Sequence, residues 1–334
     1  MTEPTSAPAG NVTAAPDVGE RRHSPDAPTR RGVHDLLRAA AAQHVDTGPG
    51  TAATGYRPGR TLSLRVEAAR QLRRRRTQIV GLVVVALPIL LALAFKLGGA
   101  NPGSGGSSGG SGSTLVDLAT VGAANFAMFT EFATVGFLLV VIVALFCGDT
   151  VASEASWSSL RYLLAIPVPR SRLLRQKLTV AIGFTIAVNV LMPVWGYLIG
   201  GAFFGWAPAR SPVSGEFDNT IALQRLAIVI AYAAVQALIV ASLAFWLSVM
   251  TDAPLGAVGG ATFVVVISNI IDSITALGSY RQYLPTHFQY SWLDALGPTV
   301  VWDDMIRGTG VTLVYVSVLL LATWSRFLRK DITS

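Results

Sequence analysis

Charged residues and cysteines are both scarce in this sequence of 334 residues. Asp, Glu, Lys and Arg make up 13% of it, whereas soluble domains carry about 25%. The single cysteine, Cys147, excludes a disulfide within the chain and a zinc site built from cysteines. Only 3 of the 26 basic residues are lysines, a bias that points to a GC-rich genome and not to a nucleic-acid partner. These shortages argue against a soluble domain, a disulfide scaffold and a nucleic-acid-binding protein.

Catalytic and cofactor-binding motifs are missing as well. The glycine-rich stretch 101–113 lacks the Gly-Lys-Ser/Thr ending of a phosphate-binding loop, so we do not expect the chain to bind ATP itself. His287 has no second histidine in its segment, and no Ser/His/Asp set or pair of carboxylates converges. We therefore expect no catalytic residue, no metal ion and no cofactor on this chain, which is predicted not to be an enzyme.

Long apolar runs are what the sequence has instead. Hydrophobic residues make up 51% of it, and several runs reach the length of about 20 residues that a transmembrane helix needs. The expected spans are residues 79–97, 129–148, 178–200, 226–250, 254–273 and 309–326. The sequence therefore predicts an all-α membrane protein with a six-span domain over residues 78–330. The apolar stretch before the second span is too long for one upright helix, and we expect residues 115–130 to form a separate segment at the outer face.

The distribution of Arg and Lys indicates how these spans are oriented. Residues 1–77 hold 13 of them, residues 149–177 hold 5, and the tail after the sixth span holds 3, whereas the opposite face and the span ends share the remaining 5. Cytoplasmic segments carry the excess of positive charge in membrane proteins. We therefore expect both termini and the loop 149–177 to be cytoplasmic, in a multi-pass protein of the cell membrane.

The chain before the first span divides into two parts. Residues 1–60 are rich in Pro, Ala, Thr and Gly without a sustained period, which predicts a disordered cytoplasmic tail. In residues 61–77, apolar positions recur at helical spacing beside a run of arginines, which predicts an amphipathic helix in the inner headgroup layer. Arg73–Arg76 would bind anionic lipids, at about 1 kcal/mol for each arginine. This helix is either a topology anchor alone or an elbow helix that flanks a partner-binding site.

The cytoplasmic loop 149–177 has a pattern of its own. Residues 151–166, which precede Pro167, are expected to form a short amphipathic helix along the inner face of the membrane. Its polar stripe consists of Glu154, Ser158 and Arg161. The adjacent apolar stripe consists of Trp157, Leu160 and Leu164. Such a helix suits an interface with a soluble protein.

This loop resembles a segment of the type-2 ABC transporter permeases. There the second and third spans are joined by Glu-x3-Gly-Thr, a leucine pair, Pro-Val-x-Arg and a Lys at the next span. In that register the chain has Glu154, Ser158, Ser159, Leu163, Leu164, Pro167, Val168, Arg170 and Lys177, with the two serines in place of Gly-Thr. The resemblance extends over residues 61–330 through the six spans, the elbow helix and the large outer segment before the last span.

The resemblance implies one half of an exporter. A second permease subunit, identical or different, would complete the path, and a separate ABC ATPase would bind ATP and Mg beneath the membrane. The residues that would couple to the ATPase are Glu154, Trp157, Ser158, Ser159, Arg161, Leu164, Pro167, Arg170 and Lys177. Two other functions stay open, a self-contained secondary transporter and a membrane scaffold or sensor without transport. The first would need charged residues deep in several spans and internal repeats, which the sequence does not show.

Three polar residues within the expected spans are candidates for lining a pathway: Asn189, Gln236 and Asn269. Polar groups inside a membrane are costly and often face a pathway. Asn and Gln also form hydrogen bonds between helices, so both interpretations stay open. Glu131 and Asp272 are expected near the outer interface, where carboxylates cost little.

Overall fold

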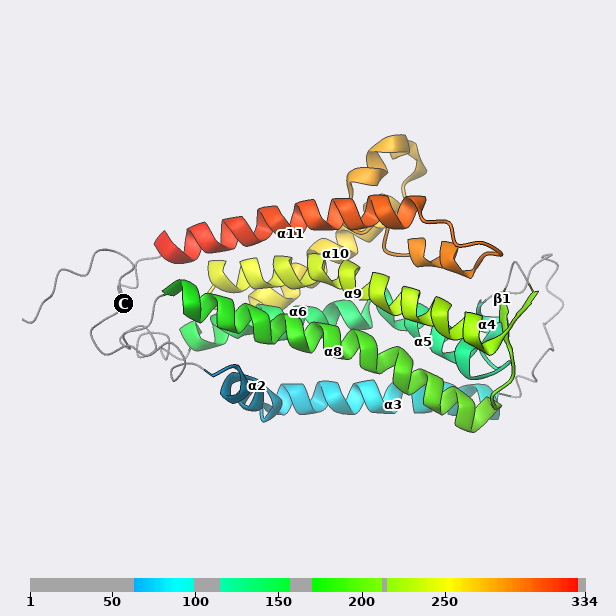
Figure 1. Ribbon diagram of the computed structural model, residues 1–334. Helices are drawn as coiled ribbons and strands as arrows, with labels where there is room; N and C mark the ends of the chain where they lie inside the picture. Colours follow the sequence, from blue (N-terminus) through cyan, green and yellow to red (C-terminus); the bar gives the residue numbers. More distant parts are fainter. Residues whose placement is uncertain (1–62, 99–114, 157–169, 212–214, 330–334) are drawn as a thin grey trace, which may run out of the picture. The chain divides into compact units, whose positions relative to one another are not determined.

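Six helices in the computed structural model are long and apolar enough to span a membrane. The structure describes residues 63–98, 115–156, 170–211 and 215–329, all within one unit. The six helices are α3 (Arg75–Leu97), α6 (Leu138–Ser156), α8 (Arg170–Phe204), α9 (Asn219–Met250), α10 (Pro254–Asp272) and α11 (Asp303–Arg329) (Figure 1). The expected number of spans is confirmed, and the chain is an all-α, multi-pass membrane protein.

The ends of the long helices follow from local sequence. α8 has 35 residues and α9 has 32, about 50 Å at 1.5 Å per residue, so both extend beyond a hydrocarbon core of about 30 Å. Asp218 caps α9, because its side chain accepts a hydrogen bond from the backbone N–H of Thr220. Pro254 begins α10, a position where its missing N–H costs nothing.

The expected second span is two helices in the structure. The short α4 (Leu115–Leu118) is followed by α5 (Ala123–Val135), and α6 begins only at Leu138. α5 has no exposed polar face, because its few polar residues, among them Asn125 and Glu131, are buried together with its apolar ones, and nearly all of it packs against α8 and α9. Residues 115–130 thus precede α6 in separate helices, as expected, and α5 is enclosed by other helices. A helix without a polar face finds its lowest free energy inside the bundle.

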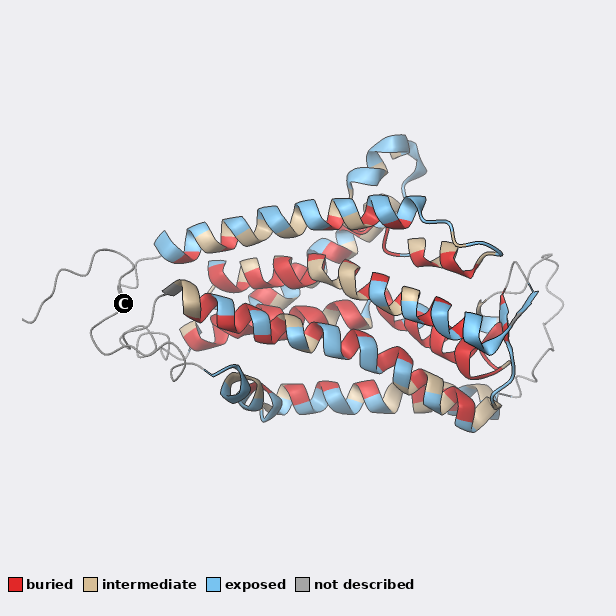
Figure 2. Cartoon of the chain, viewed as in Figure 1, coloured by how far each residue is buried: buried red, intermediate tan, exposed pale blue. Residues whose placement is uncertain are grey.

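The core lies where α6, α8 and α9 meet. α6 packs against α9, α10 and α8. In the most apolar stretch of α6, 78% of the residues are buried, whereas in the corresponding stretches of α3 and α11 only 22% and 17% are buried. Figure 2 shows this contrast, with buried residues concentrated on α5, α6 and the inner faces of α8 and α9. Phe245 and Cys147 lie fully buried in the largest apolar cluster. The outward side chains of α3 and α11, such as Leu82 and Leu321, are exposed as a lipid-facing surface requires.

The two ends of the bundle carry different elements. One end holds the hairpin of β1 (Ala209–Ser211) and β2 (Gly215–Phe217) with η2 (Ser291–Leu296) nearby, whereas η1 (Thr275–Tyr283) projects from the flank beside the start of α11. The other end holds α2 (Leu64–Leu72) and the last turn of α11. Asn125 of α5 fixes the hairpin, since its side chain donates to the Arg210 carbonyl at 2.6 Å and accepts from the Arg210 N–H at 2.8 Å.

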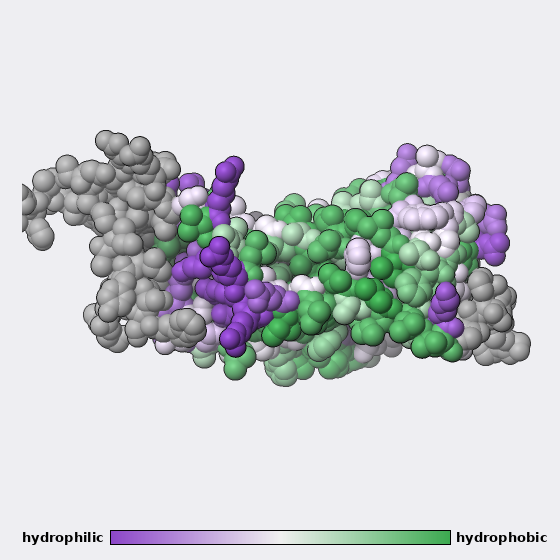
Figure 3. Space-filling model, turned by 90° about the horizontal axis from the view of Figure 1, so that it is seen from below, coloured by the Kyte–Doolittle hydropathy of each residue, from purple (hydrophilic) through white to green (hydrophobic). Residues whose placement is uncertain are grey.

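α2 presents its apolar side chains to the outside. Leu64, Val66 and Leu72 are exposed, whereas Gln71 is buried and Glu67 is half-buried on the side toward the bundle. Figure 3 shows hydrophilic residues gathered at the end where α2 lies, next to a broad apolar surface. The polar side of this helix therefore faces protein, and its apolar side is free to contact lipid.

Candidate functional site

A cluster of charged side chains joins α2 to the adjacent ends of α6 and α8. We call it the charged cluster, and its members are Glu67, Arg70, Arg74, Arg76, Asp149, Glu154 and Lys177. Its members on α6 and α8 come before and after segment 157–169 in the sequence, because α6 ends at Ser156 and α8 begins at Arg170.

Glu154 and Lys177 form the centre of the charged cluster. The Lys177 Nζ lies 2.6 Å from Glu154 Oε1, and the two side chains are only 3% and 4% exposed. Arg70 of α2 also pairs with Glu154, and Glu67 lies 3.6 Å from the Lys177 Nζ. Buried charges of this kind are tolerated only when they are paired and hydrogen-bonded. Glu154 therefore ties three helices together.

Asp149 forms the second part of the charged cluster. Its Oδ2 accepts a hydrogen bond from Arg74 Nη1 at 2.6 Å, and Arg76 pairs with its other oxygen. Arg73 and Arg75 are exposed. Of the four arginines expected to bind anionic lipid, two are thus engaged by a buried carboxylate, and the other two are exposed.

The electrostatics favour the ionised form of Glu67. Burial by itself would raise the pKa of this carboxyl group, but the nearby charge of Lys177, with those of Arg70 and Arg74, lowers the pKa below its ordinary value. Glu67 is therefore an anion at neutral pH and balances the cations around it.

The expectation that Glu154 lies on a separate surface helix is wrong. α6 continues without a break through Glu154 to Ser156, and the Glu154 side chain is buried. The sequence pattern of residues 151–166 did not reveal the partners on α2 and α8, whose charges make burial of this carboxylate favourable. Of the other expected coupling residues, Lys177 is buried in the cluster, and Arg170 is the first residue of α8. The rest lie outside the described residues: Trp157, Ser158, Ser159, Arg161, Leu164 and Pro167.

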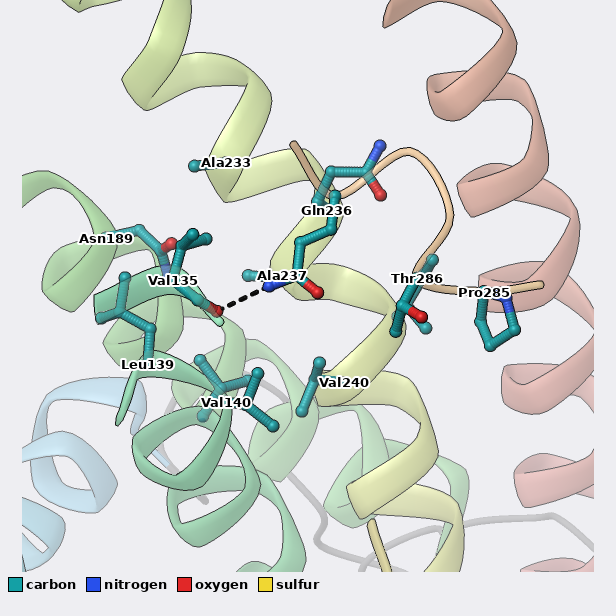
Figure 4. Close-up of a pocket in the computed structure, with 13 residues that line it drawn as sticks. Val135, Leu139, Val140, Asn189, Ala233, Gln236, Ala237, Val240, Pro285 and Thr286 are labelled. Carbon is teal, nitrogen blue, oxygen red and sulfur yellow. Dashed lines mark hydrogen bonds between the residues drawn. The ribbon is translucent and has the colours of Figure 1, made fainter. Parts of the chain in front are cut away.

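A small cavity lies in the interior of the bundle and brings two of the three expected pathway residues together. Asn189 and Gln236 both line it, and the segment that follows η1 contributes Thr286 and Gln289 (Figure 4). Its volume is about 30 Å³, which is room for one or two water molecules. Asn269 does not line this cavity.

The hydrogen bonds around the cavity connect helices that are distant in sequence. Gln236 donates to the Tyr232 hydroxyl at 2.7 Å and accepts from Thr312 of α11 at 2.9 Å. Asn189 donates to the Thr185 carbonyl of its own helix at 2.8 Å. Gln236 thus joins α9 to α11, as one of the two interpretations expects, and it also lines the cavity; that the cavity belongs to a pathway stays a prediction.

The two carboxylates expected at the outer interface have different environments. Asp272 is half-buried, and its Oδ1 lies 2.5 Å from His287 Nδ1 and 3.4 Å from Arg281 Nε. Glu131 is fully buried in α5, and neither of its oxygens has a hydrogen-bond partner among the described residues. Glu131 is therefore enclosed by protein, whereas its predicted depth near the outer interface stays a prediction. No three His, Cys, Asp or Glu side chains converge within the described ranges in a way that could hold a metal ion.

Comparison with known proteins identifies the family. A family model described as "Protein of unknown function (DUF2705)" matches residues 115–333. The chain belongs to the DUF2705 family. No curated protein matches it. The DUF2705 match includes all the residues that line the cavity. It also includes Asp149, Glu154 and Lys177 of the charged cluster, but it begins after α2 and α3.

Several residues of this DUF2705 protein were missed at the sequence level. Asp149 carried a usable signal, since it is a carboxylate directly after an apolar run in a chain with an arginine run at the start of the first span. Gln289 and Thr286 carried none, because nothing local shows that the segment after η1 folds back between helices. Hydrogen bonds across the bundle depend on the tertiary arrangement alone.

Proposed function

We propose that this DUF2705 protein is the permease subunit of an ATP-driven ABC exporter. It would form the transmembrane path with a second permease copy and be driven by a separate ATPase chain that binds ATP and Mg. The observation that carries this proposal is the charged cluster, which holds α2, α6 and α8 together on both sides of segment 157–169. The same segment carries the residues that resemble the coupling region of type-2 ABC permeases.

The charged cluster explains how such a segment would drive the spans. Glu154 lies two residues before the end of α6, and Lys177 lies in the second turn of α8. Since breaking their buried pair costs several kcal/mol, a displacement of segment 157–169 moves the two helix ends as one body. Arg70 couples the same motion to α2. A soluble ATPase beneath the membrane would need such a connection.

We place both termini and segment 149–177 in the cytoplasm of a cell whose membrane holds the protein. The excess of Arg and Lys before the first span and in this segment supports that orientation.

A second function is favoured by Glu131. A fully buried carboxylate without a partner among the described residues is a feature of proton- or cation-coupled secondary transporters. Such a transporter would work without an ATPase, so recovery of an ATPase with the purified protein separates the two functions.

The ATPase test uses a tryptophan of segment 157–169, which we call the coupling segment. An ABC ATPase is expected to co-purify with the tagged full-length chain from its native membrane. Trp157→Ala should lower that recovery about 30-fold, because loss of an aromatic hot spot often costs 2 kcal/mol or more. Trp206→Ala is the matched control, since Trp206 is exposed at the opposite end of the bundle. If the unaltered chain recovers no ATPase, the exporter is refuted, and equal recovery with Trp157→Ala would refute the coupling segment.

The orientation has its own test. In a Cys147→Ala background, cysteines placed at Gly106 and Ser214 should react with a membrane-impermeant maleimide added outside intact cells. A cysteine at Ser171, in the first turn of α8, should react only after the cells are made permeable. Labelling at position 171 in intact cells would reverse the proposed orientation.

A further inference from the structure

The segment Leu284–Leu296, which follows α10 and precedes α11 in the sequence, folds back into the bundle. We call it the return segment. Trp292 and Ala295 are fully buried in it, and Phe288 and Leu296 nearly so. Most of it is turn and 3-10 helix, so its backbone groups are not satisfied by a regular α-helix. Irregular backbone at membrane depth is tolerated only where it is buried in protein or lines a cavity, and the return segment meets both conditions.

Four polar side chains from α9, α10 and β1 hold the return segment in place. Each makes one hydrogen bond with it, at 2.6–2.8 Å: Ser268 with the Thr286 hydroxyl, Tyr232 with the Phe288 carbonyl, Arg225 with the Ala295 carbonyl, and Ser211 with the Leu296 carbonyl. In the other direction, Gln289 of the return segment donates to the Val135 carbonyl at 2.8 Å. Each of these bonds can be exchanged for a bond to water if the segment lifts, unlike the apolar packing around Phe245.

The return segment forms one wall of the interior cavity. Pro285, Thr286 and Gln289 line it together with Asn189 and Gln236, and Figure 4 shows Pro285 and Thr286 on the side away from Asn189. The lining residues that the structure describes are all uncharged, and most are apolar. The cavity therefore suits an uncharged hydrogen-bonding group on an apolar body, and it disfavours an ion.

Two glycines allow the return segment to pack this closely. A β-carbon at Gly308 of α11 would lie 2.4 Å from the Tyr232 hydroxyl and 2.5 Å from the Phe288 β-carbon. A β-carbon at Gly136 would lie 2.4 Å from the Tyr290 hydroxyl. By contrast, a β-carbon at Gly310, on the same helix, would meet no atom within 4 Å.

We infer that the return segment is a movable closure over a binding site lined by Asn189, Gln236 and Gln289, which takes an uncharged, hydrogen-bonding amphiphile when the segment lifts. In the closed position its volume of about 30 Å³ leaves room for water alone. That this site belongs to a transport path rests on the proposed function. The closure itself rests only on the hydrogen bonds, the cavity and the two close approaches.

The test measures how fast a small polar maleimide reaches the cavity. The purified full-length protein carries Cys147→Ala and Ala233→Cys, since Ala233 lines the cavity and is 1% exposed. Adding Gly308→Ala should raise the labelling rate at position 233 at least 10-fold, because the new methyl group wedges the return segment outward. Gln289→Ala should act in the same direction by removing one hydrogen bond. Gly310→Ala is the matched control and should leave the rate unchanged.

A cross-link provides the opposite perturbation. The Ser268 and Thr286 hydroxyl oxygens lie 2.8 Å apart, which places their β-carbons near the range that a disulfide needs. Oxidising Ser268→Cys with Thr286→Cys should lower labelling at position 233, as read by peptide mass spectrometry, and reduction should restore it. The cross-linking measurement tests the closure even if the Gly308→Ala variant does not fold.

Unchanged labelling in the oxidised protein would overturn the closure, and so would an equal rise in the Gly310 control. No ATPase is present in these measurements, so their outcome is separate from that of the co-purification test. An ATPase that co-purifies with a protein whose labelling does not respond would leave the exporter standing without this closure.

Discussion

Glu154→Lys is expected to lower the free energy of unfolding by about 3–5 kcal/mol or more, the range measured when one partner of a buried ion pair is removed. The new ammonium group would face Lys177 and Arg70 at a position that is 4% exposed. The expected readout is a lower midpoint of thermal unfolding for the detergent-purified protein, together with reduced levels in the membrane.

The matched control is Glu216→Lys. Glu216 also pairs with an arginine, Arg210, but the two side chains are 59% and 49% exposed, and exposed pairs contribute about 0–1 kcal/mol. Combining Glu154→Lys with Lys177→Glu should recover part of the lost stability by restoring one opposite pair. If Glu154→Lys and Glu216→Lys were equally mild, the charged cluster would not be a structural element of this protein.

The position of Glu154 also decides which residue can test the coupling segment. A loss of ATPase recovery after Glu154→Lys would follow from destabilisation as readily as from a lost contact. Trp157 is uncharged and is not a member of the charged cluster, so Trp157→Ala is expected to report on the contact with the ATPase more directly.

Trp292→Ala is expected to cost about 3–5 kcal/mol, the range for truncating a buried large aromatic side chain. Trp292 is fully buried in the cluster that joins the return segment to Met128 of α5 and Leu226 of α9. The loss should appear as a lower unfolding midpoint and as faster proteolysis within residues 284–296. Because the Trp292 indole N–H has no hydrogen-bond partner among the described residues, Trp292→Phe should cost much less than Trp292→Ala.

Trp302→Ala provides the comparison, since Trp302 is 48% exposed near the start of α11 and surface substitutions usually change stability by less than about 0.5 kcal/mol. Equal stability of the Trp292→Ala and Trp302→Ala proteins would show that the return segment contributes nothing to the fold. The movable closure would then lose its defined closed position.

The six spans were predictable because they depend on local composition. An apolar run of about 20 residues in lipid must satisfy its backbone hydrogen bonds internally, and a helix is the way for a single segment to do so. The end of α3 at Leu97 and the start of α10 at Pro254 agree with the prediction for the same reason, since a glycine pair and a proline mark them. The second span was shifted, because hydropathy does not distinguish α5, buried in protein, from a helix facing lipid.

The sequence by itself thus determined that this is an all-α, multi-pass membrane protein, because hydrophobic length acts residue by residue. Only the tertiary structure decided that Glu154 is buried with Lys177 and Arg70, that Glu131 lies in the interior, and that Gln289 reaches the cavity of Gln236. These placements depend on partners more than 20 residues away in sequence. The free energy of burying a charge or an amide is set by such partners and not by neighbours along the chain.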